Sequence, residues 1–290
     1  MSDKKKIMDE LIGYDKNRLL DDYTKLREIK RNDIKNKLMS TIGRYTVDYF
    51  TALERHETKG RRGISFFTFL KNKPKGDYID RGLKYKGYIR SNAPIKIWKD
   101  LFRLYYGSIS IFKPIVAMFI YNKYKPKSIL DMTMGWGGRL VGACALDVEK
   151  YTGIDINTKL YKPYKDMTKF LDNKTKTKIT LYFEDSVKFD YSKLDYDLVL
   201  TSPPYYNIEM YRKNKKISKD DWNEKFYKPL FFNTWTNLKK NGYYCIHVSN
   251  EIFENILQPM LGDVYEKVIM PKQKRRQDEK YHEYIYVWKK

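Results

Sequence analysis

Metal-binding and disulfide-forming residues are scarce in this 290-residue sequence, which contains two cysteines and three histidines. Cys144 and Cys245 form no CxxC pair and the histidines show no HxxxH spacing, so the sequence predicts neither a zinc site nor a disulfide framework. Apolar runs of about 18 residues, long enough to span a membrane, are lacking, and the first residues, MSDKKKIMDE, do not contain the apolar stretch of a signal peptide. We therefore expect a soluble, intracellular protein without a metal ion and without a membrane partner.

Acidic residues are heavily outnumbered, because 58 Lys and Arg stand against 36 Asp and Glu and give a net charge of +22. Residues 61–100 contain eleven basic residues against three acidic ones, and RKNKK (212–216) and KQKRR (272–276) are dense basic runs. Codon bias explains an abundance of Lys, Asn, Ile and Tyr, but it does not explain this clustering. The charge predicts a polyanionic partner, most simply a nucleic acid.

The pattern of the chain changes near residue 95. Residues 1–55 space apolar side chains three and four apart, which predicts helices. Residues 64–95 are basic and aromatic, and they predict short elements rather than one regular structure. We interpret residues 1–94 as a helical, basic N-terminal extension. It serves either as a nucleic-acid contact or as a structural cover.

Residues 95–290 alternate strand and helix patterns. Two helices with Pro94 and Pro114 in their first turns come first, and a long helix is predicted over 221–242. Strands are predicted over 128–132, 150–156, 178–185, 195–202, 243–249, 264–270 and 281–290. Such alternation is typical of an α/β fold with a doubly wound, mostly parallel sheet, and the two consecutive strands at the end predict an antiparallel C-terminal edge.

A glycine-rich turn follows the first of these strands. SILDMTMGWGGRL places Asp131 at the strand end and Gly135 and Gly137 before a helix. In a doubly wound sheet this turn lies at the carboxyl edge, where ligands bind. The next two strands also end in acids, Asp155 and Asp185, and a carboxylate at the first position can accept both ribose hydroxyls. The absence of GxGxxG favours an adenosyl ligand over a dinucleotide.

The stretch Thr201-Ser202-Pro203-Pro204-Tyr205 follows the apolar run YDLVL. Consecutive prolines fix the backbone and remove N–H donors, so the stretch presents mainly acceptors. Acceptors suit an exocyclic amino group, which Ser202, the Pro203 carbonyl and the Pro204 backbone would hold while Tyr205 stacks on the base. A sulfonium methyl donor is already reactive, so positioning can carry much of the catalysis. The alternative interpretation is a rigid turn that ends a strand.

Together these residues resemble the S-adenosylmethionine-dependent amino-methyltransferases with an (S/N/D)PPY motif, which include the DNA cytosine-N4 and adenine-N6 methyltransferases. LDMTMGWGG matches the family's cofactor motif, Ser202–Tyr205 matches its catalytic motif, and FKPIVAMFIY matches the helix before the cofactor strand. Met132–Met134 depart from the family, which has an aromatic residue before the first glycine. The resemblance implies a Rossmann-like class I methyltransferase domain over 95–290. It also implies S-adenosyl-L-methionine as cofactor, bound by Lys113, Asp131, Thr133, Met134, Gly135, Gly137, Asp155 and Asp185.

The resemblance further implies methyl transfer to an exocyclic amino group of a base in DNA, with cytosine N4 slightly favoured over adenine N6 because serine begins the motif. The basic runs predict nucleic-acid contacts at Arg212, Lys213, Lys215, Lys216, Lys274, Arg275 and Arg276. The alternatives are an RNA base methyltransferase and, from another class, a nucleic-acid-binding partner subunit with a degenerate cofactor pocket. A nicotinamide dehydrogenase is disfavoured by the missing GxGxxG. We interpret the lone His247 as structural.

Overall fold

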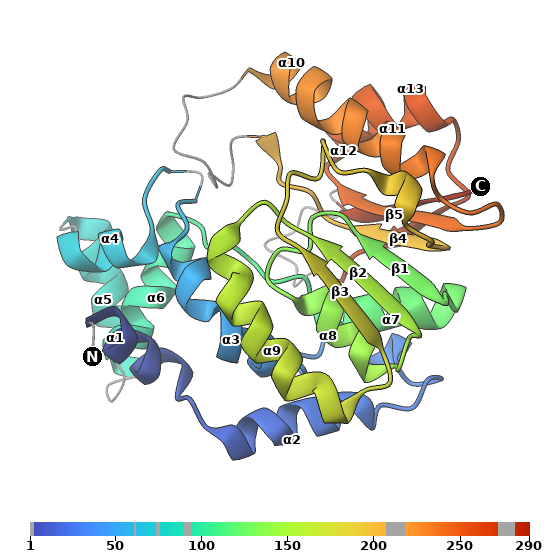
Figure 1. Ribbon diagram of the computed structural model, residues 1–290. Coiled ribbons are helices and arrows are strands. Elements are labelled where there is room, and N and C mark those ends of the chain that lie inside the picture. Colours follow the sequence, from blue (N-terminus) through green and yellow to red (C-terminus); the bar gives the residue numbers. More distant parts are fainter. Residues whose placement is uncertain (1–2, 61, 74–75, 90–93, 207–217, 272–281) are drawn as a thin grey trace.

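The computed structural model describes residues 3–60, 62–73, 76–89, 94–206, 218–271 and 282–290. Its centre is a seven-stranded sheet in the order β3-β2-β1-β4-β5-β7-β6 (Figure 1). The pairs from β3 to β5 are parallel, whereas β7 runs antiparallel to both β5 and β6. The predicted doubly wound sheet with an antiparallel C-terminal edge is therefore confirmed.

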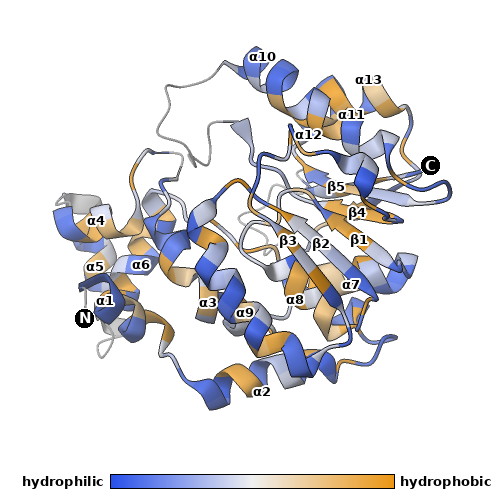
Figure 2. Cartoon of the chain, viewed as in Figure 1, coloured by the Kyte–Doolittle hydropathy of each residue, from blue (hydrophilic) through white to orange (hydrophobic). Residues whose placement is uncertain are grey.

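The central strands are buried on both faces. The strands are β1 (Ser128–Asp131), β2 (Lys150–Ile154), β3 (Lys178–Tyr182), β4 (Leu198–Thr201), β5 (Tyr243–Val248), β6 (Glu266–Ile269) and β7 (Tyr284–Lys289). Every residue of β1 and β4 is buried, as expected for parallel strands with helices on both sides. Figure 2 shows hydrophobic residues along these two strands and mainly hydrophilic ones along α10 (Lys219–Trp222). The order of the strands places the ends of β1 and β4 next to each other at the point where the chain reverses its winding.

Helices cover both faces of the sheet. One face packs against α7 (Pro114–Tyr124), α8 (Gly138–Ala145) and α9 (Tyr161–Leu171). The other face packs against two helical stretches: α10, η6 (Asn223–Tyr227) and α11 (Lys228–Thr236), then α12 (Asn250–Ile252), η7 (Phe253–Leu257) and α13 (Gln258–Leu261). Short 3-10 turns are η2 (Thr158–Leu160), η3 (Asp172–Lys174) and η4 (Tyr191–Lys193).

The helix predicted over 221–242 is wrong at its C-terminal end, because it stops at Thr236. Leu238 then donates to the Trp235 carbonyl and Lys239 to the Tyr196 carbonyl, so the chain turns toward β5 before Gly242. The helical stretch over Asn250–Leu261 was not predicted. Ser249 caps it by accepting a bond from the Ile252 N–H.

The N-terminal region forms a helical layer beside the sheet (Figure 1). It contains α1 (Asp3–Ile12), α2 (Lys16–Arg27), η1 (Lys35–Lys37), α3 (Arg44–Glu57), α4 (Phe66–Asn72), α5 (Asp77–Ile89) and α6 (Pro94–Tyr105). Short elements were predicted over residues 64–95, and α4 and α5 form there, with the Ser65 side chain capping α4. α3 contacts both α8 and α9, which brings this layer against the glycine turn. Among the described helices, none is long and apolar enough to cross a membrane.

Candidate functional site

The glycine turn and the TSPPY stretch meet at the carboxyl ends of β1 and β4. Thr201 at the end of β4 donates its hydroxyl to Asp131 Oδ1 at 3.0 Å. The Thr133 and Thr201 hydroxyl oxygens lie 2.6 Å apart. Two motifs that are far apart in the sequence are thus joined directly by side-chain hydrogen bonds. They lie where a doubly wound sheet binds its ligands.

Asp131 supports this junction from inside the protein. Its carboxylate is completely buried, and Oδ2 accepts bonds from Arg139 Nε and the Tyr151 hydroxyl, both at 2.7 Å. With the Thr201 bond, three donors surround it, so its buried charge is paired as such a charge requires. In this structure the enclosed Asp131 carboxylate supports the junction, and its direct contact with the cofactor stays a prediction.

Asp155 shapes the glycine turn. Its carboxylate accepts the Gly135 N–H at 2.9 Å and the Asn157 N–H at 2.8 Å. Met134 N–H also donates to the Ile154 carbonyl at 2.9 Å, so the turn is bound to the end of β2. Gly137 has φ of +92° as it caps α8, a conformation that side-chain-bearing residues rarely adopt. Burial raises the pKa of Asp155 to about 6.

Asp185 lies on the same edge of the sheet. Its carboxylate accepts the Val187 N–H at 3.1 Å in the loop after β3. The adjoining Ser186 donates its hydroxyl to the Met132 carbonyl at 2.5 Å. This bond ties the Asp185 loop to the end of β1, so the three predicted acids, Asp131, Asp155 and Asp185, share one edge of the sheet.

Lys113 does not reach the turn with its side chain. Its Nζ donates to the carbonyls of Leu38 and Met39, at 3.4 and 3.3 Å. The contact with the turn comes instead from the backbone of Phe112, whose carbonyl oxygen lies 1.8 Å from the point where a Cβ on Gly138 would stand. The Lys113 ammonium group is bound to the N-terminal layer in this structure, and the cofactor contact of its side chain stays a prediction.

Ser202 and Tyr205 converge on His247 of β5. The Ser202 Oγ and the Tyr205 hydroxyl each lie 3.0 Å from His247 Nδ1. On the far side of the ring, His247 Nε2 is 3.5 Å from Glu283 Oε2. The two hydroxyls of the predicted catalytic motif therefore share one imidazole nitrogen, which fixes both side chains in a partly buried setting.

The two prolines hold the rest of the motif. Pro203 is buried, and the Pro204 carbonyl accepts the Tyr227 hydroxyl at 2.5 Å. The same Tyr227 oxygen accepts the Tyr206 N–H at 2.9 Å, and Tyr206 has φ of +45°. The Pro204 carbonyl, predicted to hold the target amino group, is instead bound to Tyr227 in this structure. The Ser202 hydroxyl and the Pro203 carbonyl remain as the candidate acceptors.

The predicted nucleic-acid contacts at 212–216 and 274–276 lie outside the described residues, so the structure gives no account of them. Within the described ranges, no group of three or more His, Cys, Asp or Glu residues is arranged to hold a metal ion. His247 and Tyr227 belong to the site but were not predicted from the sequence. The position of His247 near the end of an apolar strand was the available signal, but the pairing of β5 with β4 was needed to use it.

No protein-family model matches the sequence, and no curated protein sequence matches it. Solved structures similar to it include TrmN from Thermus thermophilus, with 13% identity over 61% of this chain and 48% of that chain and a TM-score of 0.43. An rRNA methylase from Streptococcus thermophilus is 12% identical over 62% of this chain and 99% of that chain, with a TM-score of 0.42. A methyltransferase from Geobacter sulfurreducens is 12% identical over 77% and 95% of the two chains, with a TM-score of 0.43. Because these sequence identities and TM-scores are low, the fold assignment rests on the strand order of the sheet.

Proposed function

We propose that this protein transfers a methyl group from S-adenosyl-L-methionine to an exocyclic amino group of a base in DNA, with cytosine N4 slightly favoured over adenine N6. The observation that carries the proposal is the 2.6 Å contact between the Thr133 and Thr201 hydroxyls. This contact places the glycine turn, which suits an adenosyl ligand, beside the Ser202–Tyr205 stretch, which suits an amino group. Methyl transfer needs these two groups in van der Waals reach of each other.

The residues around the glycine turn fit the cofactor. Asp155 is partly exposed at the end of β2, and each of its oxygens accepts one backbone bond, which leaves lone pairs for the ribose hydroxyls. Asp185, on the same edge, would accept from the adenine amino group. The Gly135–Gly137 backbone would face the methionine part. When bound, S-adenosylmethionine would supply an electrophilic methyl group.

Ser202 would accept a proton of the target amino group. To do so it must direct its own hydroxyl hydrogen elsewhere, and His247 Nδ1 at 3.0 Å is placed to accept it. The neighbouring Glu283 favours the tautomer in which Nε2 carries the hydrogen. The Ser202 lone pairs are then free to aim the amino group, so His247 acts as a positioning residue.

We expect His247→Ala to lower the rate of methyl transfer about tenfold, since a freely rotating hydroxyl loses its alignment. Cofactor affinity should stay unchanged because the glycine turn is not altered. The matched variant is His247→Asn, whose amide oxygen can occupy the place of Nδ1 and should restore most of the rate. Single-turnover rates with labelled cofactor measure both. Equal rates for His247→Ala and the wild type would contradict the positioning role.

The raised pKa of Asp155 predicts a pH-dependent cofactor affinity. The ionised carboxylate is the form that accepts two ribose hydroxyls, and its fraction falls as the pH drops through about 6. We therefore expect affinity to be constant above pH 7 and about tenfold weaker at pH 5, as the protonation equilibrium requires. Calorimetric titration with S-adenosylhomocysteine measures this. Asp155→Asn should bind weakly at every pH, and a flat profile in the wild type would oppose the assignment.

The proposed reaction is tested by incubating the purified protein with tritiated S-adenosylmethionine and, separately, duplex DNA, single-stranded DNA and RNA. Nucleoside mass spectrometry then identifies the product. N4-methylcytosine or N6-methyladenine from DNA would support the proposal, and label only in RNA would select the RNA alternative. If no polymer is labelled and no cofactor binds, the partner-subunit interpretation replaces it.

A further inference from the structure

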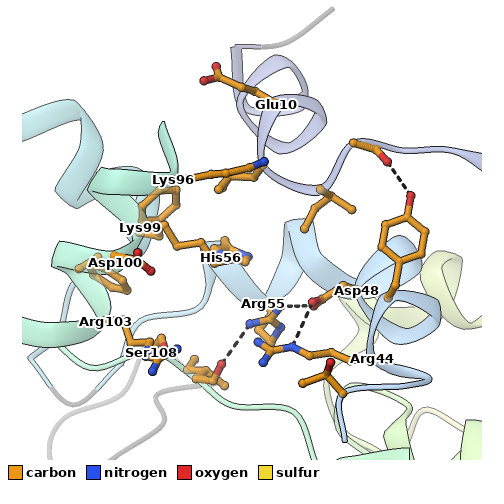
Figure 3. Close-up of a pocket in the computed structure, with 18 of the residues that line it drawn as sticks. Glu10, Arg44, Asp48, Arg55, His56, Lys96, Lys99, Asp100, Arg103 and Ser108 are labelled. Atoms are coloured by element: carbon orange, nitrogen blue, oxygen red, sulfur yellow. Dashed lines mark hydrogen bonds and ion pairs between the residues drawn. The ribbon is translucent and has the colours of Figure 1, made fainter. Parts of the chain in front are cut away.

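A cavity of about 700 Å³ lies within the N-terminal layer (Figure 3). Its volume is within the range of about 300–1,000 Å³ that is usual for small-molecule sites. α3 and α6 each contribute more lining residues than any other element, and further residues come from α1, α2, α4 and the loops, including the 107–109 segment. Thr51, on α3, donates to the Trp136 carbonyl of the glycine turn at 3.2 Å, whereas Asp48 and Arg55 of the same helix line the cavity. The cavity is therefore a neighbour of the candidate methyl-transfer site, and α3 separates the two.

α6 contributes a row of positive charge to this cavity. Lys96, Lys99 and Arg103 are spaced three and four residues apart, which places them on one face of the helix. All three line the cavity, and none of them is ion-paired to another described residue. Burial lowers the pKa of Lys99, because its ammonium group is partly removed from water. A cation in that position is stabilised by an anion that enters the cavity.

α3 contributes a buried arginine to the opposite wall. Arg55 is 4% exposed, forms an ion pair with Asp48 and donates Nη1 to the Ile109 carbonyl at 3.1 Å. Its Nε is buried and has no hydrogen-bond partner among the described residues. A buried N–H without an acceptor is unfavourable, so an acceptor atom at this place would be stabilised. The arginine therefore points to a ligand with oxygen acceptors.

His56 and two aromatic rings complete the wall around Arg55. His56 Nδ1 lies 2.6 Å from the Ala52 carbonyl, so this nitrogen carries the ring hydrogen and Nε2 is an acceptor. Burial, and then the charge of Arg55, lower the pKa of His56 to about 3, which keeps the ring neutral. Phe66 and Phe102, both buried, also line the cavity. Cationic, neutral polar and aromatic surfaces are thus combined in one cavity.

The acidic residues that line the cavity are largely engaged by protein groups. Asp48 pairs with Arg55 and with Arg44, whose Nε is 3.5 Å away. Asp22 accepts the Thr46 N–H at 2.8 Å, and Asp21 pairs with Lys25 at 2.7 Å. Figure 3 shows Lys96 and Lys99 on the α6 wall facing His56 and Arg55 on the α3 wall. Glu10 and Asp100 also line the cavity, but its seven Lys and Arg residues outnumber its five acids, so the charge left for a ligand is positive.

We propose that this cavity binds a phosphate group of a nucleotide, either a free nucleotide or one within a nucleic-acid strand. Lys99 and Arg103 contact the phosphate oxygens from α6, and the Arg55 Nε donates from α3. The aromatic walls accommodate the nucleoside. This site is additional to the proposed methyl-transfer site and does not depend on it. Phosphate is the anion whose several oxygens suit such a converging set of donors.

The test is isothermal titration of the full-length protein with pyrophosphate and with uridine diphosphate. The uracil base has no exocyclic amino group and no adenine ring, so it does not suit the candidate cofactor and base sites. Lys99→Met and Arg103→Gln should each weaken binding about tenfold, the usual loss for a charge-assisted hydrogen bond. The control is Lys165→Gln, which removes one positive charge from the exposed face of α9 and should bind like the wild type.

A labelled single-stranded oligonucleotide distinguishes the two sources of phosphate. If uridine diphosphate displaces it and both α6 variants weaken its binding, the site holds strand phosphates. If only the free nucleotide depends on Lys99 and Arg103, the site holds a free nucleotide. Arg103 is exposed, so Arg103→Gln should fold even if Lys99→Met does not. The proposal would be overturned if none of the three probes bound. It would also be overturned if Lys99→Met and Arg103→Gln both left the binding of the probes unchanged.

Discussion

Ser202→Ala should lower the rate of methyl transfer about a hundredfold while cofactor affinity remains that of the wild type. Removing one preorganised hydrogen-bonding group from a reacting centre typically costs about 100- to 1,000-fold in rate. The Ser202 hydroxyl is held 3.0 Å from His247 Nδ1, so it is preorganised in this sense. The glycine turn has separate contacts to Asp155 and should keep its shape.

The measurement pairs single-turnover rates on DNA with calorimetric titration of S-adenosylhomocysteine. Ser192→Ala is the matched control, since Ser192 is exposed and its hydroxyl bonds only locally to Asp190. That control should leave both quantities unchanged. If Ser202→Ala transfers methyl groups at the wild-type rate, the role proposed for the Ser202 hydroxyl is wrong. Loss of cofactor binding in Ser202→Ala would show that the residue acts on the turn.

Gly138→Ala should destabilise the protein by about 3 kcal/mol or more, at the upper end of overpacking effects. An added Cβ would stand 1.8 Å from the Phe112 carbonyl oxygen and 3.0 Å from its carbon. These are backbone atoms two residues before α7, so they cannot rotate away as a side chain can. Relief requires α7 and α8 to separate, which would also displace the glycine turn and weaken cofactor binding.

Urea unfolding followed by circular dichroism measures the free energy of unfolding of this variant. Gly60→Ala is the matched control, because the nearest atom to its added Cβ is the Gly107 carbonyl oxygen at 3.9 Å. We expect that control to change stability by less than about 0.5 kcal/mol, as surface substitutions usually do. Equal unfolding midpoints for the two variants would show that the α7–α8 contact is more yielding than the structure indicates.

The sheet and the edge that carries the site could be predicted because the signals are local. SILD and LVLT are short apolar runs bounded by polar residues, and both form fully buried strands. Acids that follow such strands must lie at the carboxyl edge, and Asp155 does contact the turn there. The role of Asp131 could not be predicted, because its partners Arg139 and Tyr151 come from other elements and meet it only after the sheet forms.

Side-chain direction was the second limit. Lys113 stands beside Pro114 in the sequence, yet its ammonium group is bound to carbonyls of the N-terminal layer, whose position depends on tertiary packing. His247 was interpreted as structural since a lone histidine carries no pattern. Its contact with Ser202 depends on β5 lying next to β4, and no local stretch of the sequence predicts the order of the strands.

The reversed direction of β7 has a consequence for how the end of the chain reaches the site. Parallel strands end at the ligand edge of the sheet, whereas the antiparallel β7 begins there. Glu283, which directly precedes β7, therefore lies at this edge. β6 ends at the same edge, because the Met270 N–H donates to the Glu283 carbonyl at 2.8 Å. The antiparallel direction of β7 thus places the Glu283 carboxylate 3.5 Å from His247 Nε2. A parallel strand in the same position would bring its last residues, not Glu283, to this edge.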